Sequence, residues 1–269
     1  MDKIVVEGGA TLRGSVEAGG AKNAALPLVF ASLLTDERCY LSNVPDVADI
    51  HTAVGLLESM GATVERPKPG ELVLDTSGVN HWAAPYELVR RMRASFVTLG
   101  PLLARFGRAE VSTPGGCAIG SRPVDLHMEA LRRLGAKIEL EHGNVEAHAE
   151  RGLRGGHVIL AMPSVGATEN VMMAASRAVG TTRIENAARE PEIVDLAEAL
   201  IKMGAQIEGA GSSIIEIQGV DRLGGFTHSV LPDRIVAGTF AIAAAMTGGD
   251  VTITDARATD LEALIEKLE

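Results

Sequence analysis

Residues 56–64 read LLESMGATV, and the same pattern returns as LRRLGAKI at residues 131–138 and as LIKMGAQI at residues 200–207. Each copy is the end of an amphipathic helix, followed by Gly-Ala and the start of a strand. A glycine directly after a helix is typical of a left-handed C-terminal cap, which ends the helix and turns the chain. The pattern therefore predicts three helix-turn-strand units, spaced by about 65–75 residues.

A second pattern, a small-residue apolar helix followed by a turn and a strand, alternates with the first. It occupies residues 23–44, 93–113, 170–186 and 234–254. Together the two patterns give a βαβαββ repeat, which cannot bury its apolar faces alone. We therefore expect three complete copies to pack their helices together, with the sheets outside or between them, in one α/β domain spanning residues 22–229.

A fourth copy of the repeat begins at Arg234 and is incomplete. Its second helix places four apolar residues at helical spacing, namely Leu261, Leu264, Ile265 and Leu268. The sequence ends before the Gly-Ala cap and the strand that the other copies contain. Because half a repeat leaves apolar helix faces uncovered, we expect more chain, or another chain, to complete it.

Composition excludes several classes of protein. The 269 residues include 46% hydrophobic and only 3% aromatic residues, which favours tightly packed aliphatic layers. Two cysteines, Cys39 and Cys117, fit neither a disulfide scaffold nor a zinc site. A net charge of −10 argues against nucleic acid and anionic lipid as partners. The longest apolar stretches are too short to span a membrane, and residues 1–7 do not resemble a secretion signal, so we expect a cytoplasmic protein.

The loop PGGCAIGSRPVDLH at residues 114–127 is the strongest chemical signal in the chain. Its three glycines allow the backbone to approach a ligand closely. The Cys117 thiol would be activated if a nearby cation stabilised its thiolate, and Arg122 is close enough in sequence to do so. Taken alone, the loop composition is equally compatible with Cys117 being a small packing residue.

Two other cations are candidates for binding phosphate. Lys22 follows two glycines at the start of a helix, where backbone amides also attract anions. Arg93 opens a helix within a basic run, and a cation there opposes the helix dipole unless a ligand phosphate compensates it. The alternative for both residues is an exposed cation in water.

The remaining titratable residues have ordinary structural interpretations. We expect His51 and His127 to be helix caps or surface residues, and Cys39 to be a core residue of a strand. Three carboxylates, Asp49, Asp125 and Glu192, lie at helix starts, where the helix dipole favours them without any catalytic role.

Six motifs together resemble the enolpyruvyl transferase family, and within it the branch that acts on UDP-N-acetylglucosamine. They are GGAKNAA at 19–25, RMRAS at 91–95, the loop at 114–127, PSVGATEN at 163–170, ENAAREPE at 185–192 and LPDR at 231–234. The resemblance implies two similar domains, each an inside-out α/β barrel of three βαβαββ units. It also implies that residues 1–21 and 230–269 are part of a second domain whose remainder is missing from this chain.

The reaction implied by the resemblance moves the enolpyruvyl group of phosphoenolpyruvate to the 3-hydroxyl of UDP-N-acetylglucosamine and releases phosphate. It is the first committed step of peptidoglycan synthesis, and it needs neither a cofactor nor a metal. An aspartate and a late arginine of the family's machinery would lie beyond residue 269. We therefore expect negligible turnover from this chain alone, unless a complementing C-terminal chain supplies them.

The resemblance assigns roles residue by residue. Cys117 is the acid that protonates phosphoenolpyruvate and the site alkylated by fosfomycin, Lys22 and Asn23 hold phosphoenolpyruvate, and Arg122 assists both substrates. The UDP-sugar is held by Arg93, Arg122, Pro123, Val124, Asp125 and Leu126, and its diphosphate by Ser164, Val165 and Gly166. One position departs from the family, because Met162 stands where some members have a lysine that contacts phosphate.

Two alternatives share much of this pattern. The shikimate-directed enolpyruvyl transferases have the same fold and use phosphoenolpyruvate, but they lack the cysteine loop. A non-catalytic module that kept one domain and its nucleotide-sugar contacts would also fit the motifs. A module that stands alone should cap its last helix and cover its apolar face.

Overall fold

The computed structural model describes residues 3–89, 92–113, 124–141 and 143–269. The chain divides into two compact units. Residues 22–230 form the larger unit, and residues 1–21 together with 231–269 form the smaller unit.

Within its described residues, the larger unit contains three four-stranded sheets with one common plan. In each sheet two strands pair in parallel, and the rest of the ladder is antiparallel. The first sheet has the order β13 (Thr227–Ser229), β2 (Cys39–Ser42), β4 (Leu72–Asp75), β3 (Thr63–Glu65). The second has the order β5 (Ala83–Ala84), β6 (Arg108–Ser112), β8 (Asn144–His148), β7 (Lys137–Glu141). The third has the order β11 (Gln206–Glu208), β12 (Ile214–Gln218), β10 (Thr181–Glu185), β9 (His157–Ile159).

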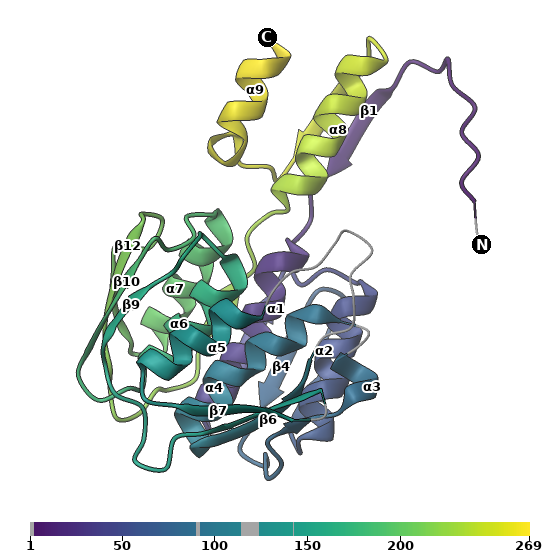
Figure 1. The fold of residues 1–269 in the computed structure, drawn as a ribbon. Helices are drawn as coiled ribbons and strands as arrows, with labels where there is room; N and C mark the ends of the chain where they lie inside the picture. Colours follow the sequence, from purple (N-terminus) through teal and green to yellow (C-terminus); the bar gives the residue numbers. More distant parts are fainter. Residues whose placement is uncertain (1–2, 90–91, 114–123, 142) are drawn as a thin grey trace. The chain divides into compact units, whose positions relative to one another are not determined.

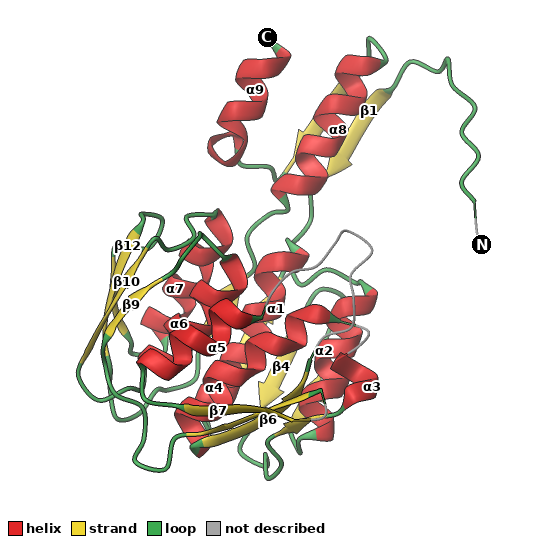
Figure 2. Ribbon diagram, viewed as in Figure 1, coloured by secondary structure: helices red, strands yellow, loops and turns green. Residues whose placement is uncertain are grey.

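The sheets lie outside and the helices inside, as Figures 1 and 2 show. The inner helices are α1 (Lys22–Ala31), η2 (Arg93–Thr98) continuing into α4 (Leu99–Phe106), and α6 (Val165–Ala175). Every residue of 24–31 and of 167–175 is buried, so α1 and α6 have almost no solvent-facing side. The strands alternate buried and exposed residues, as β8 and β12 do, because only one sheet face meets the helices. The predicted inside-out α/β arrangement is confirmed.

The helices that precede the three Gly-Ala turns end as the sequence pattern predicts. They are α2 (Ala48–Ser59), α5 (Asp125–Arg133) and α7 (Pro191–Lys202), while the short α3 (Tyr86–Val89) precedes η2. The glycines that follow them, Gly61, Gly135 and Gly204, all have positive φ angles, of 104°, 90° and 104°. The next alanine N–H donates back to the carbonyl of a leucine five residues earlier, at 3.0, 3.2 and 2.9 Å. All three turns therefore share one left-handed cap and lead directly into a strand.

The first repeat takes its leading strand from the other end of the larger unit. Strand β13 pairs in parallel with β2, with Thr227 opposite Tyr40. The side chain of His228 in β13 is buried, and its Nε2 lies 2.8 Å from Asp195 Oδ1 in α7. The ring of three repeats is thus closed by a strand distant in sequence, which the repeat pattern did not predict.

Arginines occupy the end of the larger unit where the inner helices finish. Arg105, in the last turn of α4, donates to the Leu33 carbonyl at 3.2 Å, and Arg177 donates to the Leu34 carbonyl at 3.4 Å. Both carbonyls belong to η1 (Ser32–Leu34), which continues α1. Cations stabilise the negative ends of helices, so these two residues compensate the carbonyls that gather there.

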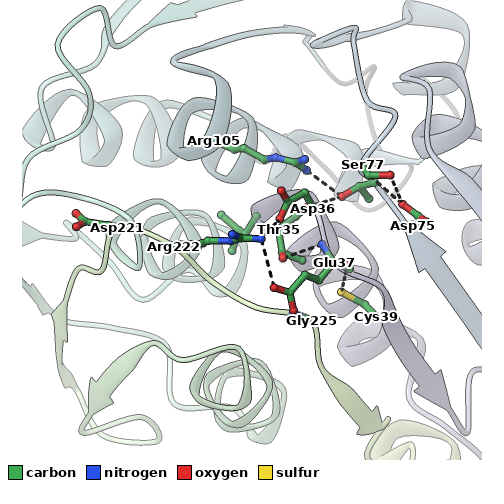
Figure 3. A network of polar contacts seen from close by, with 12 residues as sticks. Thr35, Asp36, Glu37, Cys39, Asp75, Ser77, Arg105, Asp221, Arg222 and Gly225 are labelled. Carbon is green, nitrogen blue, oxygen red and sulfur yellow. Dashed lines mark hydrogen bonds and ion pairs between the residues drawn. The ribbon is translucent and has the colours of Figure 1, made fainter.

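At the same end, polar contacts join the third repeat to the first (Figure 3). Arg222 donates to Asp36 Oδ1 at 2.9 Å, and the Gly225 N–H donates to Glu37 Oε2 at 3.0 Å. These contacts connect the end of the third repeat to the start of the first. Cys39, which follows in β2, is fully buried as expected, and burial raises the pKa of its thiol to about 12.

Asn170 in α6 joins two inner helices at a close approach of their backbones. Its Oδ1 accepts a hydrogen bond from the Gly100 N–H at 2.6 Å, and its Nδ2 donates to the Phe96 carbonyl at 3.0 Å. A Cβ built on Gly100 would clash with the Asn170 carbonyl oxygen. The glycine is therefore required for the approach, and the Asn170 amide links the backbones of η2 and α4 to α6.

Glu169, the preceding residue of α6, is a carboxyl group in the core. It is 5% exposed, and within the described residues no hydrogen bond or ion pair engages it. Burial, and then the nearby carboxylates Glu192 and Glu190, raise the pKa of Glu169 to about 8. The residue is therefore protonated at neutral pH.

The smaller unit is built around one parallel strand pair. Strand β1 (Arg13–Glu17) pairs with β14 (Asp250–Thr254), and Asp233 caps α8 (Arg234–Met246) by accepting from the N–H groups of Ile235 and Val236. The predicted last helix is present as η3 (Ala258–Leu261) and α9 (Glu262–Leu268), with Leu261 and Leu264 against Gly238 of α8. Several apolar side chains of α8 and α9 are exposed: Ile235, Phe240, Ile242, Met246, Ile265 and Leu268. Among the described residues, no helix is both long and apolar enough to cross a membrane.

We expect Asn170→Asp to lower the free energy of unfolding of the larger unit by about 3 kcal/mol. A carboxylate can accept from Gly100 but cannot donate to the Phe96 carbonyl, and it buries a charge. The single tryptophan of the chain, Trp82, lies in the larger unit, so its fluorescence during urea denaturation measures this quantity. Asn80→Asp, at an exposed position, is the control. Equal stability of the two variants would contradict the role given to Asn170.

Glu169→Gln should stabilise the larger unit increasingly as the pH rises from 4.5 to 8. An ordinary glutamate, as in the unfolded chain, has a pKa of 4.5, whereas the pKa of folded Glu169 is about 8, so only the unfolded state loses this proton between those values. The group therefore reduces native stability by up to about 1.4 kcal/mol per pH unit over that range. We expect a difference of about 4 kcal/mol between the variant and the native chain at pH 8, and little difference at pH 4.5.

Urea denaturation of both proteins at pH 4.5, 6 and 8, followed by Trp82 fluorescence, tests this expectation. Glu198→Gln, on the exposed side of α7, is the matched control and should show no such trend. A stability difference for Glu169→Gln that does not change with pH would show that Glu169 is ionised in the folded chain.

Candidate active site

The first turns of several helices meet at one end of the larger unit. Lys22 Nζ, at the start of α1, lies 2.8 Å from Asp49 Oδ2 in the first turn of α2. His127, in the first turn of α5, lies against Gly166 in the first turn of α6. In α6, the pKa of Glu169 is raised in part by the nearby carboxylate of Glu192, in the first turn of α7. The N-terminal ends of these helices are therefore neighbours.

This end of the larger unit favours anions. The first N–H groups of a helix have no partners within the helix, and the helix dipole adds about half a positive charge at that end. Lys22 and Arg93 add two full charges at the starts of α1 and η2. The Lys22 side chain is 43% exposed although its ammonium pairs with Asp49, so it can still contact a ligand from solvent. The arrangement can bind phosphate or carboxylate groups.

The start of α6 has the features of an anion site. Ser164 is the N-cap residue, and its hydroxyl accepts from the Ala167 N–H at 3.4 Å. Val165 and Gly166 form the first turn of α6. All three residues are partly exposed, so a ligand can reach their backbone N–H groups.

The predicted uridine-binding residues are only partly described. Val124 precedes α5, while Asp125 and Leu126 form its first turn, and all three have exposed surface. Cys117, Arg122 and Pro123 lie outside the described residues. Their roles stay predictions.

The structure brings several of the other predicted residues to this end. Asn23 follows Lys22 and is exposed at the start of α1, and Arg93 is half-buried. The helix that Arg93 opens is a 3-10 helix for six residues before α4 begins. Met162, the departure from the family pattern, is 57% exposed, two residues before the α6 cap.

His127 differs from its predicted role. It is neither a cap nor a surface residue, because its side chain is buried and its Nδ1 lies 2.8 Å from Asn170 Nδ2. Burial, and then the positive charge of Arg93, lower the pKa of His127 to about 4. The nearby residues that decide its burial, Gly166 and Asn170, belong to the next repeat, so the local sequence carried no signal for it.

The other residues given ordinary interpretations behave as follows. His51 is exposed, and its Nε2 lies 2.8 Å from Asp46 Oδ1, as expected of a surface residue. Asp49, Asp125 and Glu192 all occupy first turns of helices. Among the described residues, no group of three His, Cys, Asp or Glu side chains is placed to hold a metal ion.

Comparison with known proteins agrees with this geometry. A family model described as EPSP synthase (3-phosphoshikimate 1-carboxyvinyltransferase) matches residues 6–269. The chain is 52% identical over 269 residues to a protein of Shewanella woodyi and 55% identical over 268 residues to one of Serratia proteamaculans. Both relatives are named UDP-N-acetylglucosamine 1-carboxyvinyltransferase. The chain aligns over 100% of its own length and spans 64% of the length of these curated relatives.

Solved structures share the fold at lower identity. The enolpyruvyl transferase NikO from Streptomyces tendae superposes with a TM-score of 0.77 at 23% identity, covering 88% of this chain and 56% of that one. An EPSP synthase from Acinetobacter baumannii gives a TM-score of 0.71 at 21% identity, covering 89% and 54% of the two chains. The family model, the inside-out fold and the anion-binding end of the helices agree, and the chain belongs to the EPSP synthase family of enolpyruvyl transferases.

Proposed function

We propose that this chain is the part of a UDP-N-acetylglucosamine enolpyruvyl transferase that carries the reactive cysteine and the nucleotide-sugar contacts. The observation that carries the proposal is the 52–55% identity, over the whole chain, to relatives with that name. The fold alone does not choose between family members, because the superposed structures are only 21–23% identical to this chain. The helix starts gathered at one end of the larger unit support anionic substrates.

In the proposed reaction, phosphoenolpyruvate gains and then loses a proton at C3. Protonation of C3 accompanies attack of the sugar 3-hydroxyl on C2, which forms the new C–O bond as the O–H bond breaks and its proton passes to a base. Loss of a proton from C3 then expels phosphate and leaves the enolpyruvyl ether. We assign the proton donor to Cys117, and we assign Arg122 to stabilising its thiolate and the phosphoenolpyruvate anion.

The described residues supply binding rather than proton transfer in this proposal. Lys22 and Asn23, at the start of α1, would hold phosphoenolpyruvate. Arg93 and the start of α6 would hold the diphosphate of the nucleotide sugar, and residues 124–126 its uridine. These residues would place charged donors where the two substrates carry negative charge. Binding would then hold the substrates next to each other, so the entropy lost in bringing them together would not add to the barrier of the chemical step.

We also propose that the larger unit is the complete first domain and that the smaller unit belongs to a second domain. The common plan of the three sheets supports the first part. The exposed apolar faces of α8 and α9 support the second, because such faces are ordinarily covered in a finished domain.

The proposal predicts that fosfomycin forms one adduct with the native chain, on Cys117. Cys39 is the internal control, because its thiol is fully buried with a pKa of about 12 and should remain unmodified. Digestion and mass spectrometry locate the adduct, and Cys117→Ala should form none. Reaction at both cysteines, or at neither in a folded chain, would contradict the role of Cys117.

Competition between ligands distinguishes the proposed substrate from that of the shikimate branch. We expect UDP-N-acetylglucosamine to bind and to accelerate alkylation of Cys117, and shikimate 3-phosphate to do neither. Because we expect negligible turnover from this chain alone, phosphate release that needs UDP-N-acetylglucosamine and that Cys117→Ala abolishes is to be measured on a chain extended through the second domain. Displacement of UDP-N-acetylglucosamine by equimolar shikimate 3-phosphate would favour the shikimate branch instead.

A further inference from the structure

An imidazole closes one side of the first turn of α6. A Cβ built on Gly166 would lie 2.9 Å from His127 Cε1 and 3.3 Å from its Nε2, so the Cε1–Nε2 edge of the ring faces that turn. The ring also packs against Phe96, with centroids 5.2 Å apart and planes at 88°. The side chain of His127 is only 5% exposed. The ring therefore has one fixed orientation.

Backbone groups determine which nitrogen of this ring carries the proton. The Gly100 N–H can only donate, so the Asn170 atom 2.6 Å from it must be the amide oxygen. The amide nitrogen of Asn170 then donates one hydrogen to the Phe96 carbonyl at 3.0 Å and the other to His127 Nδ1 at 2.8 Å. His127 Nδ1 is therefore an acceptor, and the proton of the neutral ring is on Nε2.

The ring is also neutral under ordinary conditions. Burial, and then the charge of Arg93, lower the pKa of His127 to about 4. A second proton would have to sit on Nδ1, where the Asn170 amide already donates. His127 is thus a hydrogen-bond donor of fixed direction and not an acid or base near neutral pH.

The donor hydrogen on Nε2 has no acceptor within the described residues, although the ring is nine-tenths buried. The ring edge that carries it lies against Gly166, in the first turn of α6, a helix of 11 residues. Arg93, from η2, is the charged group that acts on the ring. The first turn of α6 thus has a neutral N–H donor beside it, and the Arg93 cation lies near enough to act on the same ring.

We propose that His127 Nε2–H donates to a phosphate oxygen of a nucleoside diphosphate bound at the start of α6. This inference rests on the proposed function and adds a specificity-determining residue to the site: His127 would favour a diphosphate over the nucleoside alone. A neutral donor suits this position because it adds direction without placing a buried charge beside Arg93.

The first test uses the native chain and UDP as the probe. Long-range ¹H–¹⁵N spectra of the imidazole groups report tautomer and charge, and the His127 signals are assigned by their absence in His127→Phe. We expect the neutral Nε2–H form at pH 7, and a saturable shift of the Nε2 signals with UDP but not with uridine. A proton on Nδ1, or an Nε2 signal that bound UDP leaves unchanged, would overturn the proposal.

The second test compares affinities by calorimetry. His127→Phe keeps the ring packing but loses the donor, and we expect its affinity for UDP to fall about tenfold or more while its affinity for uridine is unchanged. His51→Phe, at a similar position in α2 but exposed, is the matched control and should bind UDP as the native chain does. An equal loss for UDP and uridine would indicate a merely structural role and would overturn the proposal.

Failure of this inference differs from failure of the proposed function. If the native chain binds neither UDP nor UDP-N-acetylglucosamine, both proposals fail. If it binds UDP and the folded His127→Phe variant binds equally well, only the role of His127 fails.

Discussion

The parallel packing of the inner helices controls both ends of the larger unit. Helices α1, η2–α4 and α6 are buried side by side, so their backbone dipoles add instead of cancelling. The negative ends are compensated internally by Arg105 and Arg177, which donate to the carbonyls at the end of α1. At the positive ends, Lys22 and Arg93 add cations to the helix dipoles, and Asp49 pairs with Lys22. An anionic ligand is the natural counterpart of this arrangement.

The core between these helices contains polar groups. Two neighbouring residues of α6 have opposite effects on stability there. Asn170 makes three hydrogen bonds, to Gly100, Phe96 and His127, so both amide hydrogens and the amide oxygen are engaged. Glu169 makes none within the described part of the chain and must hold a proton to remain buried. The first residue stabilises the fold, whereas the second reduces its stability at neutral pH. A cost of this kind is commonly found close to functional sites.

The sequence was informative wherever a structure depends on neighbouring residues. The Gly-Ala turns were predictable because a left-handed cap is decided within a few residues, and the apolar inner helices were predictable from their composition. The pairing of β13 with β2 was not, because it depends on closure of the whole ring. The burial of His127 was not predictable either, since Gly166 and Asn170, from the following repeat, create its surroundings.

The contrast between His127 and Lys22 shows how fold and site are connected. Lys22 is half-exposed on the rim of the helix starts, and its long side chain can adjust to a ligand. His127 is held by contacts that also hold the inner helices together, because Asn170 bonds to Gly100 and Phe96 with the same amide group that fixes the imidazole. The direction of the Nε2–H is therefore set by the packing of α4 against α6, before any ligand arrives. A donor positioned in this way loses little entropy when it binds, which is the advantage of building part of a site from the core.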